Sequence, residues 1–349
     1  MAGGKTVDRP LTGVTLKRKA LALLSGGLDS TLAIKVMLDQ GIEVEALNFT
    51  SPFCTCTSKN AGCKSEAIRV ASEFNIPIKV MNKGIDYLEV VRKPRHGYGK
   101  ALNPCVDCRI FLLRKAREYM IESGADFVIT GEVLGQRPMS QRRDTLRVIE
   151  RESGLEGLLL RPLSAKFFKP TIPELQGWVN RDKLLAMQGR SRQAQMQLAE
   201  ELDIKNYPCP GGGCLLTETA FVPKIKDIFA HSDTLEMRDF RLLKIGRHFR
   251  IGPHTKVIIG RNEQDNSALE LNAQAAEARL RWLDGSSPHA LVTGVVDETL
   301  LALAARLLLR YTRAELNQEC SVQVIRDVTE TSVTIRNDWD ETFLESLRI

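Results

Sequence analysis

Long apolar runs, leader signals and repeats are all missing from this 349-residue chain. No apolar run approaches the length that spans a membrane, and residues 1–19 lack the apolar segment of a secretory leader. Alanine at position 2 excludes N-myristoylation. Fixed-period repeats and low-complexity tracts do not occur. We therefore expect a cytoplasmic protein with no membrane contact and enough residues for two domains.

Two common phosphate-binding signatures are missing as well. The chain has no G-x-x-x-x-G-K-[ST] loop, and its glycine turn is too short for a dinucleotide-binding G-x-G-x-x-G. The five histidines show no metal-ligand spacing. The net charge of +6 permits a nucleic-acid partner without requiring one.

The eight cysteines are grouped along the chain rather than spread evenly. In a cytoplasmic protein such grouping indicates metal or redox chemistry more than a disulfide framework. They are Cys54, Cys56 and Cys63, then Cys105 and Cys108, then Cys209 and Cys214, and a lone Cys320.

The most informative stretch is a glycine turn after an apolar run. Residues 20–24 are apolar, and a helical pattern runs from Asp29 to about Gln40. A tight turn between a strand and a helix points several backbone N–H groups into one concavity, where a phosphate fits. Asp29 and Ser30 can cap the helix or reach a phosphate and its Mg²⁺. The predicted phosphate loop is Ser25, Gly26, Gly27, Leu28, Asp29 and Ser30.

Strand and helix patterns alternate from residue 20 onwards, which predicts an α/β fold with a parallel sheet covered by helices on both faces. Ligands of such sheets sit beyond the carboxyl ends of the strands. The phosphate loop follows the first expected strand and Thr130-Gly131-Glu132 follows the fourth, so both should line one edge. The expected strands are 20–24, 44–49, 78–81, 127–130 and 158–160, and the expected helices are 29–40, 63–75, 107–123, 140–152 and 192–203.

The chain divides into three parts. Residues 1–19 are polar, basic and aperiodic, which predicts a flexible arm. The Pro/Gly-rich stretch 208–214 ends the regular alternation, so we place the first domain at 20–220. Residues 221–349 predict a smaller α+β domain, with a β-rich stretch at 242–261, a helix at 297–313 and a strand pair at 321–326 and 332–336.

Cys105 and Cys108 form a C-x-x-C at the start of a predicted helix, where backbone N–H groups lower a thiol pKa. With Cys214 as third ligand, these thiolates could hold a [4Fe–4S] cluster with one open iron that binds sulfide. A catalytic persulfide dithiol is a second interpretation. Structural zinc, completed by Cys209 or by the Cys54 group, is a third. The glycines before Cys214 allow close approach to a bulky group and favour it over Cys209.

A third motif surrounds Gly131 and Gln136. Glycine at a strand end allows close approach to a nucleotide, and Gln136, Ser140 and Gln141 offer neutral hydrogen bonds to a base or phosphate. On spacing alone, an ordinary loop and helix cap explain this stretch equally well.

These motifs together resemble a known group of enzymes. S-G-G-x-D-S at 25–30 resembles the pyrophosphate (PP) loop of ATP pyrophosphatases, which have an adenine nucleotide alpha hydrolase-like fold. G-E-x-L-G-Q with Ser140-Gln141, and Leu160-Arg161-Pro162-Leu163, are similar to tRNA 4-thiouridine synthetase, although one extra residue separates Gln136 from Ser140. Asn-Pro-Cys at 103–105 and Gly-Cys at 213–214 resemble the tRNA 2-thiouridylases. The cysteine trio resembles the cluster-dependent tRNA thiolation enzymes.

The resemblance covers residues 20–218 and implies ATP and Mg²⁺ as cofactors and tRNA as partner. It does not identify the modified nucleotide, because the chain shows neither the N-terminal RNA-binding module of the 4-thiouridine synthetases nor a rhodanese-like domain. The second domain resembles the RNA-binding domain of the NFACT family over about 30 residues. That resemblance implies backbone contacts from Lys244, Arg247, Arg250, Lys256 and Arg261.

Basic residues flank the expected active edge. A charge run is usually a solvated face, whereas proximity to the edge favours contacts with an RNA backbone. The residues are Arg92, Lys93, Arg95, His96, Lys100, Arg137, Arg142, Arg143 and Arg147.

The hypothesis is an ATP-dependent tRNA sulfurtransferase that adenylates a base carbonyl and replaces its oxygen with sulfur. Asp29 would hold the metal, and Cys105 and Cys214 would deliver sulfur from sulfide or a persulfide carrier. The rivals are an adenylating enzyme acting on a small molecule, a non-catalytic zinc- and RNA-binding protein, and a redox-labile regulator. A homodimer stays open.

Overall fold

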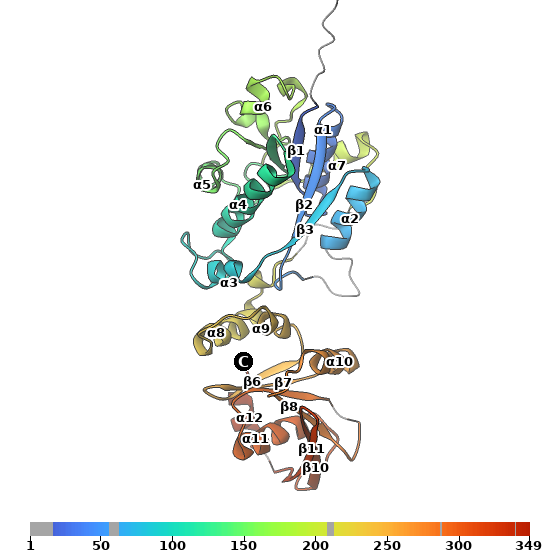
Figure 1. Ribbon diagram of the computed structural model, residues 1–349, viewed down its shortest axis with the longest axis vertical. Helices are drawn as coiled ribbons and strands as arrows, with labels where there is room; N and C mark the ends of the chain where they lie inside the picture. Colours follow the sequence, from blue (N-terminus) through green and yellow to red (C-terminus); the bar gives the residue numbers. More distant parts are fainter. Residues whose placement is uncertain (1–16, 56–62, 208–212, 287, 339) are drawn as a thin grey trace, which may run out of the picture.

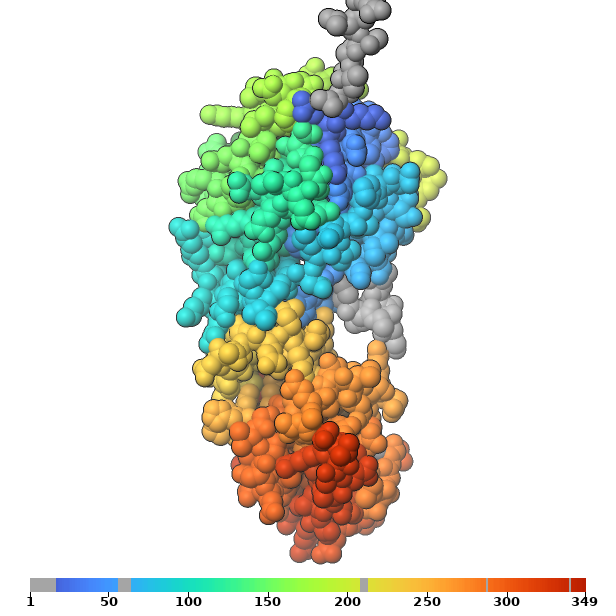
Figure 2. All heavy atoms as spheres, in the orientation of Figure 1, coloured from blue at the N-terminus to red at the C-terminus, as the bar shows by residue number. Residues whose placement is uncertain are grey.

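The computed structural model describes residues 17–55, 63–207, 213–286, 288–338 and 340–349. Residues 1–16 of the predicted flexible arm lie outside this range. The molecule is elongated, with one β-sheet toward each end and helices α8 and α9 between them (Figure 1). Figure 2 shows the two halves in contact at this level. No helix within the described ranges is both long and apolar enough to cross a bilayer.

The first sheet has five parallel strands in the order β3-β2-β1-β4-β5. Each apolar run predicted from the sequence forms one strand, displaced by two residues or fewer. The predicted α/β fold class is confirmed. The strands are β1 (Lys19–Leu23), β2 (Glu43–Thr50), β3 (Ile78–Asn82), β4 (Phe127–Thr130) and β5 (Leu159–Leu160).

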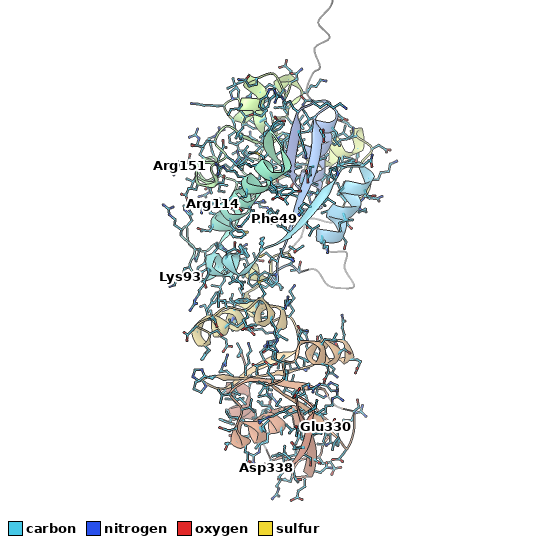
Figure 3. All side chains as sticks on the ribbon, viewed as in Figure 1. Phe49, Lys93, Arg114, Arg151, Glu330 and Asp338 are labelled. Carbon is cyan, nitrogen blue, oxygen red and sulfur yellow. The ribbon has the colours of Figure 1, made fainter. Side chains whose placement is uncertain are left out.

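Helices cover both faces of this sheet because alternate strand residues point to opposite sides. Ala20 and Ala22 pack with α1 and α2, whereas Leu21 packs with α4 and α5. Side chains from both layers fill the space beside the strands (Figure 3). The α-helices of this half are α1 (Leu28–Leu38), α2 (Cys63–Glu73), α3 (Ile85–Arg92), α4 (Cys105–Ser123), α5 (Arg143–Ser153), α6 (Ile172–Leu175) and α7 (Gln193–Glu201). The 3₁₀ turns in the described ranges are η1 (Ala165–Phe167), η2 (Arg181–Lys183), η3 (Leu215–Thr217) and η4 (Thr219–Phe221).

Strand order reverses direction beside β1, since β2 lies on one side of it and β4 on the other. In a parallel sheet such a reversal opens a crevice at the carboxyl ends of the two strands. The phosphate loop leaves β1 and Gly131 leaves β4 at this point, so the topology brings the two motifs to one edge.

The second sheet is antiparallel and has six strands in the order β11-β10-β8-β9-β7-β6. Val257 and Ile259 face α11, while Ile258 packs with Leu269 of α10 on the opposite face. The strands are β6 (Arg247–Gly252), β7 (Thr255–Ile259), β8 (Ala278–Trp282), β9 (Ala290–Gly294), β10 (Glu319–Arg326) and β11 (Thr329–Arg336). The helices are α8 (Val222–His231), α9 (Met237–Leu242), α10 (Glu263–Asn272), α11 (Glu298–Leu309) and α12 (Glu341–Ser346).

One apolar cluster joins the two halves. Phe53 and Tyr87 from the first half pack with Ile225 of α8 and Phe240 of α9. The rings of Phe53 and Phe240 meet edge to face, with centroids 5.6 Å apart. Both phenylalanines are fully buried. Helices α8 and α9 are therefore anchored to the first half, although they follow it in sequence.

Candidate active site

The turn between β1 and α1 forms a concave loop. Gly26 has φ +78°, a conformation that other residues rarely adopt. The N–H of Ser25 donates to Ser30 Oγ at 3.3 Å, and the Ser30 hydroxyl donates to the carbonyl of Gly27 at 2.8 Å. Gly27 supplies no side-chain cap to α1. The first amides of this helix are therefore available to an anion.

The segment after β4 lies directly against this loop. A Cβ atom on Gly131 would overlap the backbone of Asp29 and Ser30, so only glycine fits there. Gln136 Nε2 donates to Asp29 Oδ2 at 3.0 Å. The structure thus brings the Ser25–Ser30 loop, Gly131 and Gln136 into one site.

Buried oxygen atoms without partners mark the same place. Asp29 Oδ1 and Gln136 Oε1 accept no hydrogen bond from any described residue, and Glu132 Oε1 faces the Arg109 guanidinium without a hydrogen bond. A buried acceptor without a donor is costly, so such atoms indicate a missing ligand. Carboxylate and amide oxygens are the donors that Mg²⁺ prefers. Asp29 and Gln136 therefore fit a magnesium ion beside the phosphate loop.

Glu132 connects the loop region to two arginines. Its carboxylate is 2% exposed, with Arg161 Nε 3.1 Å from Oε2 and Arg109 Nε 3.6 Å from Oε1. Burial by itself would raise the pKa of Glu132, but Arg109 and Arg161 outweigh it and lower that pKa. Arg109 directly follows Cys108, so the network extends to the cysteine motif.

Cys105 begins α4, and Cys108 lies one turn later. Cys108 Sγ accepts hydrogen bonds from Lys83 Nζ at 3.3 Å and from the Tyr87 hydroxyl at 3.2 Å. Desolvation alone would raise the pKa of Cys108, yet Lys83, Tyr87 and Arg109 lower it. Cys108 is therefore the thiol of the three most favoured as a thiolate.

Cys214 reaches the same neighbourhood from the far end of the domain. Its backbone forms an antiparallel bridge with Cys54, and the adjacent Leu215 N–H donates to the carbonyl of Phe53 at 2.8 Å. Burial, and then Cys108 and Cys54, raise the pKa of Cys214 to about 11. Burial and Cys108 raise the pKa of Cys105. The pKa of the Tyr87 hydroxyl is raised well above its usual value, mainly by burial and further by the charges of all three thiols.

These three cysteines share one neighbourhood around Tyr87. Among the described residues, no three His, Cys, Asp or Glu side chains are arranged to hold a single metal ion. A four-iron cluster separates its thiolates more widely than one ion does, and its positive charge would favour the ionised form of Cys105 and Cys214. Thiolates are the ligands that iron–sulfur clusters use. Cys56, Cys209 and the side chain of Cys63 lie outside the described residues.

The charges of Arg109 and Arg137 act on Cys105, and that of Arg137 also acts on Asp29 of the phosphate loop. Arg109 lowers the pKa of Arg137, burial adds to this effect, and Cys105, Asp29 and Glu132 oppose it. Arg137 remains accessible to solvent although protein atoms surround much of its side chain. This position suits an arginine that meets a phosphate during the reaction.

Some predicted contacts take another role. Ser140 and Gln141 are buried, and Gln141 Oε1 accepts the Arg137 backbone N–H at 2.9 Å. Gln141 therefore shapes the loop rather than facing a base. The sequence analysis missed Lys83 and Tyr87. Lys83 directly follows β3, and its place at the carboxyl end of a strand was the available signal.

The cations predicted to meet RNA in the second half are mostly engaged within the protein. The carboxylate of Asp227 on α8 accepts two hydrogen bonds from the Arg250 guanidinium, at 2.7 and 2.9 Å. It also forms an ion pair with Lys256 at 3.3 Å. Lys256 is 7% exposed. Lys244 Nζ donates to the carbonyl of Cys54 at 2.6 Å, which ties this half to the cysteine site. Arg247 lies over the Tyr311 ring, and Arg261 pairs with Asp265 at 2.6 Å.

Comparison with known families agrees with the division seen in the fold. Residues 15–169 match the family model described as thiamine biosynthesis protein (ThiI). Residues 246–344 match the model of the NFACT protein RNA binding domain. The predicted resemblance to tRNA thiolation enzymes and to the NFACT domain is confirmed.

Curated relatives share only part of the chain. A tRNA-specific 2-thiouridylase MnmA of Leptospira interrogans is 30% identical over 132 residues, or 33% of this chain and 34% of that protein. A probable tRNA sulfurtransferase of Ureaplasma parvum is 30% identical over 160 residues, or 44% and 38% respectively. The match therefore spans about a third of the length of these relatives. A 4-thiouridine synthetase–RNA complex with bound ATP aligns with a TM-score of 0.38 and 22% identity, over 65% of this chain and 52% of that one.

Proposed function

We propose that this protein is an ATP-dependent tRNA sulfurtransferase that adenylates a base carbonyl and then replaces its oxygen with sulfur. One observation carries the proposal. The phosphate loop and the cysteine group open on the same sheet edge, joined by Arg109, Glu132 and Arg137. The match to the ThiI family and the thiouridylase relatives supports the same reaction class.

ATP would lie across the carboxyl edge of the first sheet. The amides of residues 26–30 and the start of α1 would hold its phosphates. Asp29 and Gln136 would hold Mg²⁺, which when bound neutralises charge on the leaving pyrophosphate. Gly131 leaves room for the nucleotide because it adds no side chain at the loop.

The first chemical step forms a base adenylate. A carbonyl oxygen of a tRNA uracil or cytosine attacks the α phosphorus, and the bond to the bridging oxygen breaks as pyrophosphate leaves. Arg137, whose charge interacts with Asp29 and Cys105, would meet the α phosphate as negative charge moves. The base has to be unstacked to reach this edge.

The second step replaces the activated oxygen. A sulfur nucleophile adds to the ring carbon, and AMP leaves with the former carbonyl oxygen. A [4Fe–4S] cluster held by Cys105, Cys108 and Cys214 would supply an open iron that binds an exogenous sulfide. In the alternative route, an external persulfide carrier first transfers a sulfane sulfur to Cys105 or Cys214. The outer sulfur of that persulfide adds to the ring carbon, and its S–S bond breaks when a second cysteine attacks the inner sulfur. This leaves a disulfide between the two cysteines, which an external dithiol reduces.

The second half would contribute RNA contacts through its exposed cations. Arg261, with a side chain 48% exposed, keeps donors free beyond its pair with Asp265. Lys244 and Arg247, which are partly buried, lie on the same half. Arg250 and Lys256 would contact a phosphate only by giving up Asp227.

The test is an anaerobic reaction of the purified chain with ATP, tRNA and sulfide. AMP is quantified by chromatography and thionucleosides by mass spectrometry. We expect both products from the wild type, loss of the thionucleoside in Cys108→Ala, and near wild-type yields in Cys320→Ala, since Cys320 lies in the second half. Iron, sulfide and zinc analysis of the wild type and Cys108→Ala then separates a cluster from the persulfide route.

Other outcomes would contradict the proposal. AMP formation that needs no tRNA would identify a small-molecule adenylating enzyme. Zinc without AMP formation would identify a non-catalytic protein. Equal thionucleoside yields from the wild type and Cys108→Ala would remove the cysteine group from the reaction.

A further inference from the structure

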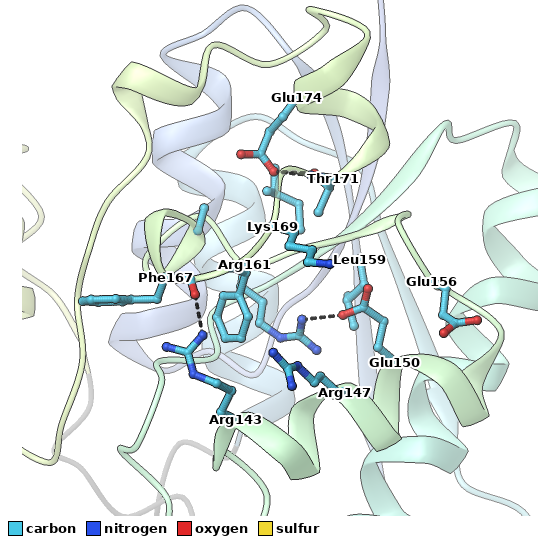
Figure 4. Close-up of a pocket in the computed structure, with 13 residues that line it drawn as sticks. Arg143, Arg147, Glu150, Glu156, Leu159, Arg161, Phe167, Lys169, Thr171 and Glu174 are labelled. Atoms are coloured by element: carbon cyan, nitrogen blue, oxygen red, sulfur yellow. Dashed lines mark hydrogen bonds and ion pairs between the residues drawn. The ribbon is translucent and has the colours of Figure 1, made fainter.

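A pocket of about 470 Å³ opens beside the edge strand β5. Helix α5 forms one wall, and the segment from η1 to α6 forms the other (Figure 4). None of the loop residues 25–30 and none of the cysteines that the structure describes line it. We call this hollow the β5-edge pocket. The residues that line it include Arg143, Arg147, Arg161, Phe168 and Lys169.

Three cations on the rim point into the pocket. Arg143 and Arg147 lie four residues apart and so share one face of α5, while Lys169 comes from the opposite wall (Figure 4). The Arg147 side chain is 67% exposed, and among the described residues it pairs with Asp144 alone, at 3.8 Å. Lys169 is exposed and makes no hydrogen bond or ion pair with a described residue. Both cations are thus available to a ligand.

The acids of the pocket do not cancel these charges. Glu150 accepts from Arg161 at 2.8 Å, and Glu174 caps α6 and pairs with Arg181. Glu156 is the remaining lining acid. Three rim cations therefore face one uncompensated carboxylate, which favours an anionic ligand.

The arginines are also held in position. The guanidinium of Arg143 lies 5.6 Å from the Phe168 ring centre and donates to the carbonyl of Phe167 at 2.6 Å. That of Arg161 lies 5.5 Å from the same ring centre. A preoriented guanidinium loses little entropy when it binds a phosphate, and its fork matches phosphate oxygens.

One side chain connects the pocket to the active site. Arg161 is 3% exposed at its side chain, and it pairs with Glu132 on one side and Glu150 on the other. Glu132 is also the partner of Arg109 at the site edge. One ion-pair network therefore connects the floor of the pocket to the nucleotide site.

We infer that the β5-edge pocket binds a backbone phosphate of the RNA substrate, through Arg147 and Lys169, while the target base occupies the active edge. The inference rests on the proposed function for the identity of the RNA. Arg250 and Lys256 of the second half are already paired with Asp227, so they offer little charge to an RNA backbone. The pocket would supply cations that the second half lacks. A phosphate of a free nucleotide has the same chemistry, and the test separates the two sources.

The test compares Arg147→Ala/Lys169→Ala with Arg117→Ala/Arg151→Ala, a control that removes the same charge from exposed positions outside the pocket. Figure 3 shows Arg151 at the outer edge of the molecule. Affinity for tRNA is measured at several salt concentrations. The logarithm of the affinity falls linearly with the logarithm of the salt concentration, and each lost phosphate contact makes this negative slope shallower by about 1. We expect a change of about 1 in the pocket variant, because the inferred site holds one phosphate, little change in the control, and a smaller change in Arg147→Lys/Lys169→Ala, which keeps one cation at the site.

Activity separates this inference from the proposed function. The pocket variant should raise KM for tRNA and keep kcat for AMP formation. A wild type that binds no tRNA would refute the proposed function. Equal slopes in the pocket variant and the control, with wild-type binding intact, would overturn the pocket alone. A weaker affinity for ATP in equilibrium dialysis with an unchanged RNA salt slope would assign the pocket to a free nucleotide and overturn the inference too.

Discussion

Replacing Glu132 with glutamine should destabilise the protein strongly. The carboxylate is buried, and it faces guanidinium groups at 3.1 and 3.6 Å. Removing one partner of a buried ion pair costs about 3–5 kcal/mol because the other charge stays buried. Arg161 keeps Glu150 at 2.8 Å, so we expect the low end of that range, about 3 kcal/mol.

Urea titrations followed by circular dichroism measure this change in the free energy of unfolding. Glu150→Gln is the matched control, since the Glu150 side chain is 22% exposed and its loss should cost about 1 kcal/mol. A Glu132→Gln protein within 1 kcal/mol of the wild type, or no less stable than Glu150→Gln, would refute the reasoning.

The same variant has a defined pH dependence. Folding lowers the pKa of Glu132 below 4.5. The unfolded chain therefore binds the proton more readily, and the ionised carboxylate stabilises the folded protein at every pH above 4.5. The gap between wild type and Glu132→Gln should stay constant from pH 5 to 8 and narrow as the pH falls through the folded pKa. A gap that widens in acid would contradict this sign.

Three further predictions follow from single contacts. Gly131→Ala should weaken ATP binding at least about tenfold in equilibrium dialysis, because its Cβ would displace the loop backbone, whereas Gly252→Ala, whose Cβ would make only ordinary van der Waals contacts, should not. Phe240→Ala should lower the free energy of unfolding by about 3–5 kcal/mol in urea titrations. Burial, then Arg261 and Lys256, lower the pKa of Lys224 from 10.5 to about 8, so its charge destabilises the fold at pH 7, and this cost fades as pH rises toward 10. Lys224→Met should raise the free energy of unfolding by up to about 3 kcal/mol at pH 7. The stability of this variant should no longer increase between pH 7 and 10 as that of the wild type does.

The sequence was sufficient for the parts of the site that depend on local pattern. Short runs of three to six residues, alternating with helical patterns, define the parallel strands, and chain topology then forces their carboxyl ends together. Asp29 and Gly131 are far apart in sequence, but both follow strands of this sheet. Their meeting was predictable for that reason.

Contacts set by side-chain packing were not predictable. Tyr87 lies on α3, a helix of eight residues between Gly84 and Pro94 whose pattern is too short to detect. No local signal links Tyr87 or Lys83 to Cys108. Strands β8 and β9 were missed, since their five-residue runs show little beyond ordinary alternation.

Charge partners were equally hidden in the second half. Arg250 and Lys256 read as solvent-facing cations of a β-rich stretch. Asp227 reaches them only because α8 folds back over β6 and β7, and the hydrophobic cluster with Phe53 and Tyr87 fixes that placement. Sequence alone gives the sign of a charge but not the partner that it takes.

The most direct test of the central claim follows one oxygen atom. A tRNA labelled with oxygen-18 at the base carbonyl is incubated anaerobically with the protein, ATP and sulfide, and both AMP and the nucleosides are analysed by mass spectrometry. Adenylation followed by sulfur attack predicts one labelled AMP for each thionucleoside. Unlabelled AMP, or label retained in the RNA while AMP accumulates, would contradict the account.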